Sequence, residues 1–359
     1  MHRREFIRTG GLAATALAAR PLFAEPAAAP IRVAQIGTAH AHAAEKWATL
    51  QRLAGAFAPA GIWEPDAAQR ARAAAEPEYR GARWLSEAGL FGDAGITGVL
   101  VETELPDLLA QGRRVLESGR HLHLDKPPGA DLAAFAALQA LAAQKGRVLQ
   151  TGYMYRYHPA FQFCLRAVRE GWLGPVFAVH GDIGKVIGAG RRPWLAEHYG
   201  GSMMLLGCHL LDLAVAVLGP PERITTQRRN TFPERDGFFD HEIATLEYPR
   251  ALATVRSLLA EVGGEARRQF AVFGEKGTVE IRPLEPARVR LALARPAGGH
   301  PAGDHEVALP AVTGRYDEQL LDFARMVRGQ PSGTPQFTPA HDRLAHEVLL
   351  ESAGRIQHP

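Results

Sequence analysis

Short apolar runs alternate with helix-like segments over the first half of the chain, and this alternation most constrains the fold. The predicted strands are residues 31–37, 60–63, 98–103, 121–124 and 148–152, and the predicted helices are 43–57, 67–75, 107–118 and 132–143. Strands that alternate with helices favour a parallel, doubly wound sheet with helices on both faces. We therefore expect an α/β domain over residues 31–150.

The pattern changes after Gly152. Helical segments are predicted at residues 159–170, 317–327 and 340–356, and longer alternating segments typical of sheet at 176–187 and 243–259. Residues 269–274 and 278–281 predict a hairpin with its turn at 275–277. We expect residues 151–359 to form a second, α+β domain with an open, mainly antiparallel sheet. A length of 359 residues agrees with two domains.

The first 30 residues read as an export signal. Paired arginines at Arg3 and Arg4 precede a short apolar run from Gly10 to Ala19, and small residues follow near Ala24. This order predicts a twin-arginine signal and a periplasmic or extracellular protein. The alternatives are a random basic terminus or an uncleaved interfacial anchor. The run is too short to span a membrane.

The positive charge of the chain belongs to this leader. Residues 1–24 carry four arginines and one glutamate, which together account for the formal net charge of +3. No basic stripe with interleaved aromatic residues follows, so nucleic acid is not expected as a partner. The two cysteines, Cys164 and Cys208, form neither a disulfide framework nor a zinc spacing.

The segment Asp125-Lys126-Pro127-Pro128 closes a predicted strand with an acid, a lysine and a rigid turn. Only five of the 41 basic residues are lysines, so a lysine at this place is unusual for the chain. A desolvated lysine can release its proton, whereas arginine cannot. Lys126 is therefore a candidate for holding a substrate hydroxyl or moving its proton. The alternative is a solvated loop lysine.

The turn after the first strand is the natural site for a dinucleotide. A strand–glycine–helix turn directs backbone N–H groups and the helix dipole at a pyrophosphate. Here the pattern is degraded to Gly37-Thr38-Ala39-His40-Ala41-His42, with glycine missing at 39 and 42. Two histidines without a third partner make a poor metal site, so we expect no metal. We expect His40 and His42 to line the cofactor cleft or to cap the helix.

Two further segments carry candidate residues. Glu64 follows a predicted strand, where an acid accepts hydrogen bonds from the adenosine ribose and disfavours a 2′-phosphate. The cofactor is therefore predicted to be NAD rather than NADP, although a helix N-terminal acid before Pro65 is the alternative. The segment from Gly200 to Asp212 places His209 and Asp212 on one face of a predicted helix. With Lys126, His209 makes a plausible proton-relay pair.

With these segments the chain resembles the Gfo/Idh/MocA oxidoreductases. The resemblance rests on the Gly37 turn, Asp125-Lys126-Pro127, the segment from Gly152 to Pro159, the segment from Gly200 to Asp212, and Gly274-Glu275-Lys276-Gly277-Thr278. It implies an N-terminal Rossmann domain, a C-terminal domain whose open sheet often forms homo-oligomers (a dimer or tetramer), a bound nicotinamide cofactor and a sugar or polyol substrate. Lys126 and His209 match the catalytic positions of the family. An acid that many members carry four residues before the histidine is replaced by Leu205.

The resemblance and the residues together predict three groups of site residues. The catalytic residues are Lys126 and His209. The cofactor-binding residues are Gly37, Thr38, Ala39, His40, Glu64, Thr103, Glu104, Asp125, Lys126 and Pro127. The substrate-binding residues are Tyr155, Arg156, Lys185, Trp194 and Asp212.

We thus predict an NAD(P)-dependent oxidoreductase that transfers a hydride between a sugar or polyol hydroxyl and its cofactor. Because free NAD is scarce outside the cytoplasm, an exported enzyme should bind NAD tightly and regenerate it in place. Two alternatives remain open: a redox-neutral, NAD-dependent glycoside-cleaving enzyme, and a sugar-binding protein that has lost catalysis through Leu205.

Overall fold

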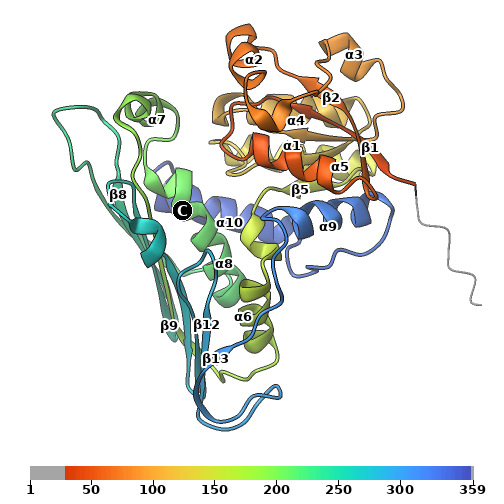
Figure 1. Cartoon of the computed structure of the whole chain (residues 1–359). Coiled ribbons are helices and arrows are strands. Elements are labelled where there is room, and N and C mark those ends of the chain that lie inside the picture. The colour runs from red at the N-terminus through yellow and green to blue at the C-terminus, as the bar shows by residue number, and fades with distance from the viewer. Residues whose placement is uncertain (1–28, 357–359) are drawn as a thin grey trace, which may run out of the picture.

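The computed structural model describes residues 29–356, and it contains two sheets that share a set of helices (Figure 1). The predicted export signal falls almost entirely outside the described residues. Among residues 29–356, no helix combines the length and the apolar character that a bilayer crossing requires. The first sheet lies in the N-terminal half and the second in the C-terminal half, as the sequence predicts.

The first sheet is parallel and has the order β2-β1-β3-β4-β5. Its elements are β1 (Ile31–Ile36), α1 (Ala43–Arg52), β2 (Phe57–Trp63), α2 (Ala67–Ala73), η1 (Pro77–Tyr79), α3 (Glu87–Phe91), β3 (Gly98–Val101), α4 (Leu105–Glu117), β4 (His121–Leu124), α5 (Leu132–Lys145) and β5 (Leu149–Thr151). Trp84 makes a single parallel bridge to Ile62 in β2. The sheet is thus a six-position Rossmann sheet whose third strand is reduced to one bridge.

Local sequence signals explain where these elements begin. The strands β1, β3 and β4 are almost wholly buried, as parallel strands covered on both faces must be. Asp66 and Asp131 accept hydrogen bonds from backbone N–H groups in the first turns of α2 and α5. Such N-caps satisfy donors that have no partner inside a helix. Because β1, β3 and β4 are parallel neighbours in the sheet, their carboxyl ends lie together at one edge.

The second sheet has eight strands in the order β13-β12-β11-β10-β6-β9-β8-β7 and is antiparallel except for the β6–β9 pair. Its strands are β6 (Val176–Gly184), β7 (Arg223–Arg229), β8 (His241–Tyr248), β9 (Ala251–Leu258), β10 (Gln269–Gly274), β11 (Gly277–Ile281), β12 (Val289–Leu293) and β13 (Gly303–Val307). The other elements are η2 (Met154–Tyr157), α6 (Pro159–Arg169), η3 (Ala189–Arg191), α7 (Arg192–His198), η4 (Met203–Gly207), α8 (Cys208–Leu218), η5 (Gly264–Arg267), α9 (Asp317–Val327) and α10 (Pro339–Ser352).

The last two helices return from the second sheet to the first (Figure 1). The ring of Phe323 in α9 packs edge-on against His123 of β4, with 6.0 Å between centroids, and also faces Gly98 of β3. Helix α10 packs against both α5 and α8. The predicted boundary near residue 150 marks where the sheets change, but residues 151–356 also complete the packing of the first sheet.

A buried ion cluster holds these parts together. The Arg156 guanidinium donates to both oxygens of Asp212, at 2.9 and 2.6 Å, and lies 2.6 Å from Asp342 in α10. His341 approaches the same Asp212 carboxylate at 2.9 Å. Burial alone would raise the pKa of Asp212, but Arg156 beside it lowers this pKa to about 2. The carboxylate is therefore ionised and fully paired.

We expect Asp212→Asn to lower the free energy of unfolding by about 3 kcal/mol, because it leaves buried charge on Arg156 with one carboxylate fewer. Urea denaturation measures the loss. The control is Asp304→Asn, which breaks an ion pair with Arg290 that is more than half exposed on both sides. That change should cost less than about 1 kcal/mol. Equal losses in the two variants would contradict a stabilising role of the cluster.

Candidate functional site

A cavity of about 550 Å³ lies between the two sheets. Its walls come from the β1–α1 turn, the end of β4, the segment before α6, helices α7 and α8, and loops near residues 265, 285 and 315. The lining residues are His40, Ala41, His42, Glu104, Lys126, Tyr155, Lys185, Ile187, Arg191, Leu195, Tyr199, Leu205, Leu206, His209, Glu265, Arg268, Glu285 and Arg315. The structure thus brings the two predicted catalytic residues, Lys126 and His209, to one cavity.

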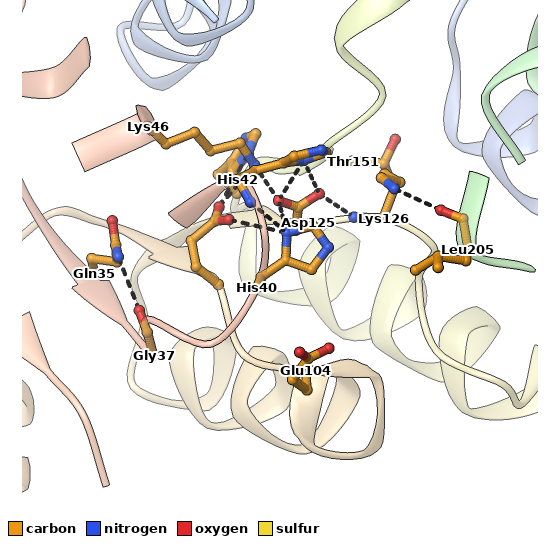
Figure 2. A network of polar contacts seen from close by, with 12 residues as sticks. Gln35, Gly37, His40, His42, Lys46, Glu104, Asp125, Lys126, Thr151 and Leu205 are labelled. Atoms are coloured by element: carbon orange, nitrogen blue, oxygen red, sulfur yellow. Dashed lines mark hydrogen bonds and ion pairs between the residues drawn. The ribbon is translucent and has the colours of Figure 1, made fainter. Parts of the chain in front are cut away.

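A buried group of charges lies directly behind this cavity (Figure 2). The Lys46 ammonium donates to Asp125 at 2.7 Å and to Glu102 at 2.8 Å, and all three side chains are fully buried. Lys46 also lies 2.8 Å from Nε2 of His123. The three charged residues come from α1 and from the ends of β3 and β4. Adjacent strand ends therefore supply two acids, and the helix supplies the cation between them.

The protonation of this group follows from its burial. Burial alone would raise the pKa of Asp125, but the imidazoles and the ammonium around it hold this pKa well below its usual value. Burial, and then the Asp125 charge, raise the pKa of Glu102 well above its usual value. Burial would lower the pKa of Lys46, but the two acids raise it overall. The Lys46 ammonium therefore lies between an ionised Asp125 and Glu102, whose raised pKa favours its protonated form.

The two histidines of the first turn also converge on Asp125. His42 Nδ1 lies 3.2 and 3.3 Å from its two oxygens, and His40 Nδ1 lies 2.9 Å from Oδ2. The sequence offered no third partner for these histidines, and the structure supplies one. These three side chains are close enough together to ligate a metal ion. However, the Lys46 ammonium already contacts the same Oδ2 atom and provides the compensating positive charge.

Lys126 is held from both of its ends. Its backbone N–H donates to Asp125 Oδ1 at 2.6 Å, and its ammonium donates to the carbonyl oxygen of Leu205 at 3.0 Å (Figure 2). Leu205 lies in η4, a short π-helix just before α8. Such segments leave carbonyl groups free for other donors and occur often at functional sites. Leu205 has no acidic side chain, but its backbone carbonyl orients the lysine.

The glycines before η4 serve this turn rather than a ligand. A Cβ on Gly201 would meet the Glu242 carboxylate, which accepts hydrogen bonds from the Met203 N–H at 2.5 Å and the Ser202 hydroxyl at 3.2 Å. Glu242 therefore satisfies the donors at the start of η4. The space beside Gly201 is therefore filled by this buried acid.

His209 faces the cavity without an acidic partner. Its Nδ1 atom is buried and has no hydrogen-bond partner among residues 29–356. Its ring lies 5.1 Å from Tyr155 and 6.3 Å from His42, measured between centroids. Burial, and then the Lys126 charge, lower the pKa of His209 well below its usual value. The imidazole is therefore neutral at neutral pH.

The first turn retains donors suited to a pyrophosphate. Gly37 has φ of +83°, and a Cβ there would lie 2.6 Å from the Thr103 methyl group, so only glycine fits. Within residues 29–356, the backbone N–H groups of Ala39 and Ala41 have no hydrogen-bond partner, and they precede the N-terminus of α1. Unpaired N–H groups at a helix N-terminus favour an anion. The turn therefore fits a dinucleotide despite its altered pattern.

Glu64 is already engaged in this structure. Its carboxylate accepts hydrogen bonds from the Thr38 N–H at 2.7 Å, from the Thr38 hydroxyl at 2.8 Å and from the Asp66 N–H at 3.0 Å. Its visible role is to hold the first turn. A ribose hydroxyl would have to share the Glu64 carboxylate with Thr38 or displace the Thr38 donors from it.

The predicted substrate-binding residues separate into two groups. Tyr155 and Lys185 line the cavity, and the Tyr155 hydroxyl donates to Glu285 at 3.1 Å. Arg156 and Asp212 do not line it, because they pair with each other in the buried cluster that joins the regions. Trp194 does not line it either, although Leu195 of the same helix and Arg191 just before that helix do.

Several cavity residues were missed in the sequence. Arg268, Glu285 and Arg315 come from loops without a recognisable pattern, and Glu285 pairs with Arg315 at 2.8 Å. Lys46 was within reach, because the scarcity of lysine that singles out Lys126 applies to it as well. Its partners lie far away in sequence, and only the strand order of the sheet brings them together.

Comparison with known proteins supports the resemblance. Residues 161–280 match the GFO/IDH/MocA C-terminal domain. The chain is 28% identical over 204 residues to the uncharacterized oxidoreductase YdgJ of Escherichia coli, covering 56% of this chain and 58% of YdgJ. It is 24% identical over 276 residues to scyllo-inositol 2-dehydrogenase (NAD(+)) of Bacillus subtilis, covering 74% and 77%. The aligned part thus spans little more than half the length of the first curated relatives.

Solved structures share the fold over nearly the whole chain. The aldose-aldose oxidoreductase of Caulobacter crescentus, complexed with glycerol, superposes with a TM-score of 0.74 at 21% identity and covers 90% of this chain and 98% of that one. The probable oxidoreductase yhhX gives a TM-score of 0.73 at 20% identity over 92% of this chain. The pairing of a Rossmann-like sheet with an open, mainly antiparallel sheet is therefore that of known oxidoreductase structures.

The cavity wall contains a second lysine, Lys185, near Lys126. Burial, and then the Lys126 charge, lower the pKa of Lys185 to about 8. Because the chain has five lysines, the ε-methylene signals of labelled protein can be followed individually by NMR as pH is raised. Lys126→Met should move the Lys185 midpoint upward, since one repelling charge is removed. Lys145→Met, at an exposed site on α5, should leave it unchanged. An unmoved midpoint in Lys126→Met would show that the two ammonium groups do not share the cavity.

Proposed function

We propose that the chain is an NAD-dependent oxidoreductase acting on a CH–OH group of a sugar or polyol. The observation that carries the proposal is the convergence of Lys126, His209 and Ala41, one of the two first-turn residues with an unpaired N–H, on one cavity between the two sheets. The similarity to scyllo-inositol 2-dehydrogenase and to an aldose-aldose oxidoreductase supports this class of substrate. Five cationic and three acidic side chains in the cavity wall supply donors and acceptors for hydroxyl groups.

The cofactor would be held by the first turn. The Ala39 and Ala41 N–H groups and the α1 N-terminus suit the pyrophosphate, and the Thr103 hydroxyl, which lacks a partner among residues 29–356, lies beside Gly37. The acid at Glu64 favours NAD over NADP. When bound, a nicotinamide supplies the acceptor for two electrons and a hydrogen from carbon.

The chain's own groups bind and orient the hydroxyl. Lys126, fixed by the Leu205 carbonyl, donates to the substrate oxygen and stabilises negative charge that develops there. A neutral imidazole of the cavity wall accepts the proton of the substrate hydroxyl. Tyr155 and Lys185 reach further hydroxyls, while Arg268 and Arg315 hold Glu285 beside the Tyr155 hydroxyl. The buried cavity walls exclude water from the reacting atoms.

We also propose that the protein is exported through the twin-arginine pathway with its cofactor already bound. The basic and apolar zones of the first 24 residues support this. Such a protein needs a slowly dissociating cofactor that is regenerated in place. A homo-oligomer, built through the open second sheet as the family resemblance implies, belongs to the same proposal.

One observation favours redox-neutral glycoside cleavage as a second candidate. The cavity shares Glu285 and Arg315 with a groove of about 910 Å³. The groove wall includes apolar residues: Pro286, Val307, Leu309, Pro310 and Val312. A wall of this kind accommodates an aglycone beyond the sugar. Release of an aglycone without net oxidation separates this candidate from a simple dehydrogenase. A protein that binds sugar and nucleotide without turnover would correspond to the third, non-catalytic alternative.

The nucleotide itself gives the first test. We expect protein purified from the exporting compartment to release NAD on denaturation, identified by its mass. Addition of a substrate sugar to the native protein should produce the near-ultraviolet absorbance of reduced nicotinamide. Absence of any nicotinamide nucleotide, together with no binding of added NAD, would contradict the proposal.

Lys126→Ala should lower turnover by about 10²–10⁴-fold, because it removes the cation at the reacting oxygen. The free energy of unfolding should change by less than about 1 kcal/mol, since the lysine makes one hydrogen bond to protein through its ammonium. Lys145→Ala is the matched control and should leave turnover unchanged. Wild-type turnover in Lys126→Ala would remove this residue from the mechanism.

A further inference from the structure

The cavity wall contains three buried imidazoles, and two of them, His40 and His42, lie against the Asp125 carboxylate. His42 Nδ1 lies against both oxygens of Asp125, at 3.2 and 3.3 Å. His209 Nδ1 has no partner among residues 29–356. An imidazole that takes a proton becomes a cation, and a buried cation needs a neighbouring anion. Burial lowers the pKa of His42 well below its usual value, and the Asp125 charge beside Nδ1 opposes this effect. His42 also lies 6.3 Å from His209, measured between ring centroids.

The contacts also fix which nitrogen of His42 faces a substrate. Asp125 is ionised, so we assign the proton between the two groups to His42 Nδ1. The Nε2 atom then carries a lone pair, and it has no hydrogen-bond partner in the described part of the chain. Since His42 lines the cavity, this lone pair is the edge offered to a ligand. A carboxylate that orients an imidazole in this way is the arrangement of a general base.

The Asp125 carboxylate is itself held in place. Lys46 donates to Oδ2 at 2.7 Å, and the Lys126 N–H donates to Oδ1 at 2.6 Å. His40 Nδ1 lies 2.9 Å from Oδ2, so both imidazoles of this turn contact the same carboxylate. The groups that face His42 are His40 on the same turn, Asp125 and Lys126 at the end of β4, His209 on α8, and Tyr316 before α9, whose ring lies 5.4 Å away. Asp125 is the only acid among them.

We propose that His42, oriented by Asp125, is the general base that takes the proton of the reacting hydroxyl in this protein. The inference rests on the proposed oxidoreductase function and deepens it. The acid that Leu205 does not supply on the α8 side is supplied from the end of β4 instead. His209 then contacts the substrate as a neutral hydrogen-bonding group, and Asp125 is a positioning residue.

In the proposed step the hydroxyl O–H bond breaks and its proton forms a bond with His42 Nε2. The C–H bond breaks as well, and its hydride would go to a bound nicotinamide dinucleotide. The C–O bond becomes C=O, so the carbon is oxidised and the nicotinamide dinucleotide is reduced. The imidazolium that forms lies against the ionised Asp125, and the reverse transfer returns the proton in the reductive direction.

The protonation state can be tested on the wild-type holoenzyme without turnover. Two-bond ¹H–¹⁵N correlation spectra of ¹⁵N-histidine-labelled protein distinguish the two neutral tautomers. The His42 signals are identified by their loss in His42→Asn. We expect the Nδ1–H form with a bare Nε2. A proton on Nε2 instead would overturn the proposal, because that nitrogen could not accept another.

Kinetics give the second test. His42→Asn keeps a short N–H donor near Asp125 and removes Nε2. We expect kcat for nucleotide reduction by the substrate sugar to fall about 10²–10⁴-fold, with KM and bound nucleotide changed less than about threefold. Added imidazole should restore part of the rate. His180→Asn on β6, where the ring contacts Thr254 at 2.9 Å, is the matched control and should retain the wild-type kcat.

Other kinetic outcomes would overturn either the role of His42 or the proposed function. Wild-type kcat in His42→Asn, with a large loss in His209→Asn, would assign the base to His209 and overturn the proposal. Loss of the nucleotide from His42→Asn would make His42 a cofactor-binding residue and also overturn it. If wild-type protein with its nucleotide reduces nothing with any sugar, the proposed function fails. The tautomer measurement still decides whether the Asp125–His42 pair is formed.

Discussion

The site depends on the buried contact of Lys46 with Asp125 and Glu102. Removing charges from water costs several kcal/mol for each ion, and the cost is recovered only when opposite charges meet in good geometry. Here a helix brings the ammonium to within 2.8 Å of both acids, which end adjacent strands. The pairing of β3 with β4 therefore determines that both acids reach the Lys46 ammonium. If the sheet paired differently, two acids and a lysine would be buried apart.

This contact organises the cavity outward. It keeps Asp125 ionised, and Asp125 in turn holds the Lys126 backbone and the His42 ring. The second region adds the Leu205 carbonyl, which takes the Lys126 ammonium, and the unpaired His209 imidazole. The Arg156 cluster joins this region to α10. The cavity thus lies between the buried Lys46–Asp125 contact on one side and the packed helix α8 on the other.

Local sequence patterns predict the helices and strands well. They do not predict contacts between side chains that lie far apart in the sequence. The strand predicted at residues 121–124 is β4, and the helix predicted at 317–327 is α9. The strands β7, β12 and β13 were not predicted, and polar residues dominate β7 and β13 at the two edges of the sheet. Lys126 and His209 reach the same cavity as predicted, because each stands at a recognisable turn or helix start.

The remaining site residues depend on long-range contacts. His42 and Asp125 lie 83 positions apart, and Lys46 and Asp125 lie 79 apart, so no spacing reveals either pair. Arg156 and Asp212 look like substrate ligands in sequence because they are polar and close to the key segments. They are 56 positions apart and bind each other instead. Glu64 stands where an acid was expected, but in this structure it holds Thr38.

Lys46 and Asp125 are stable in the core only as a pair. A double-mutant cycle, in which the free energy of unfolding is measured for each variant, tests this dependence. Lys46→Met and Asp125→Asn should each cost about 3–5 kcal/mol, because each removes one partner of a buried ion pair. The double variant should lose at least about 2 kcal/mol less than the sum of the two, since neither charge remains. Losses that add to within about 0.5 kcal/mol would contradict the account.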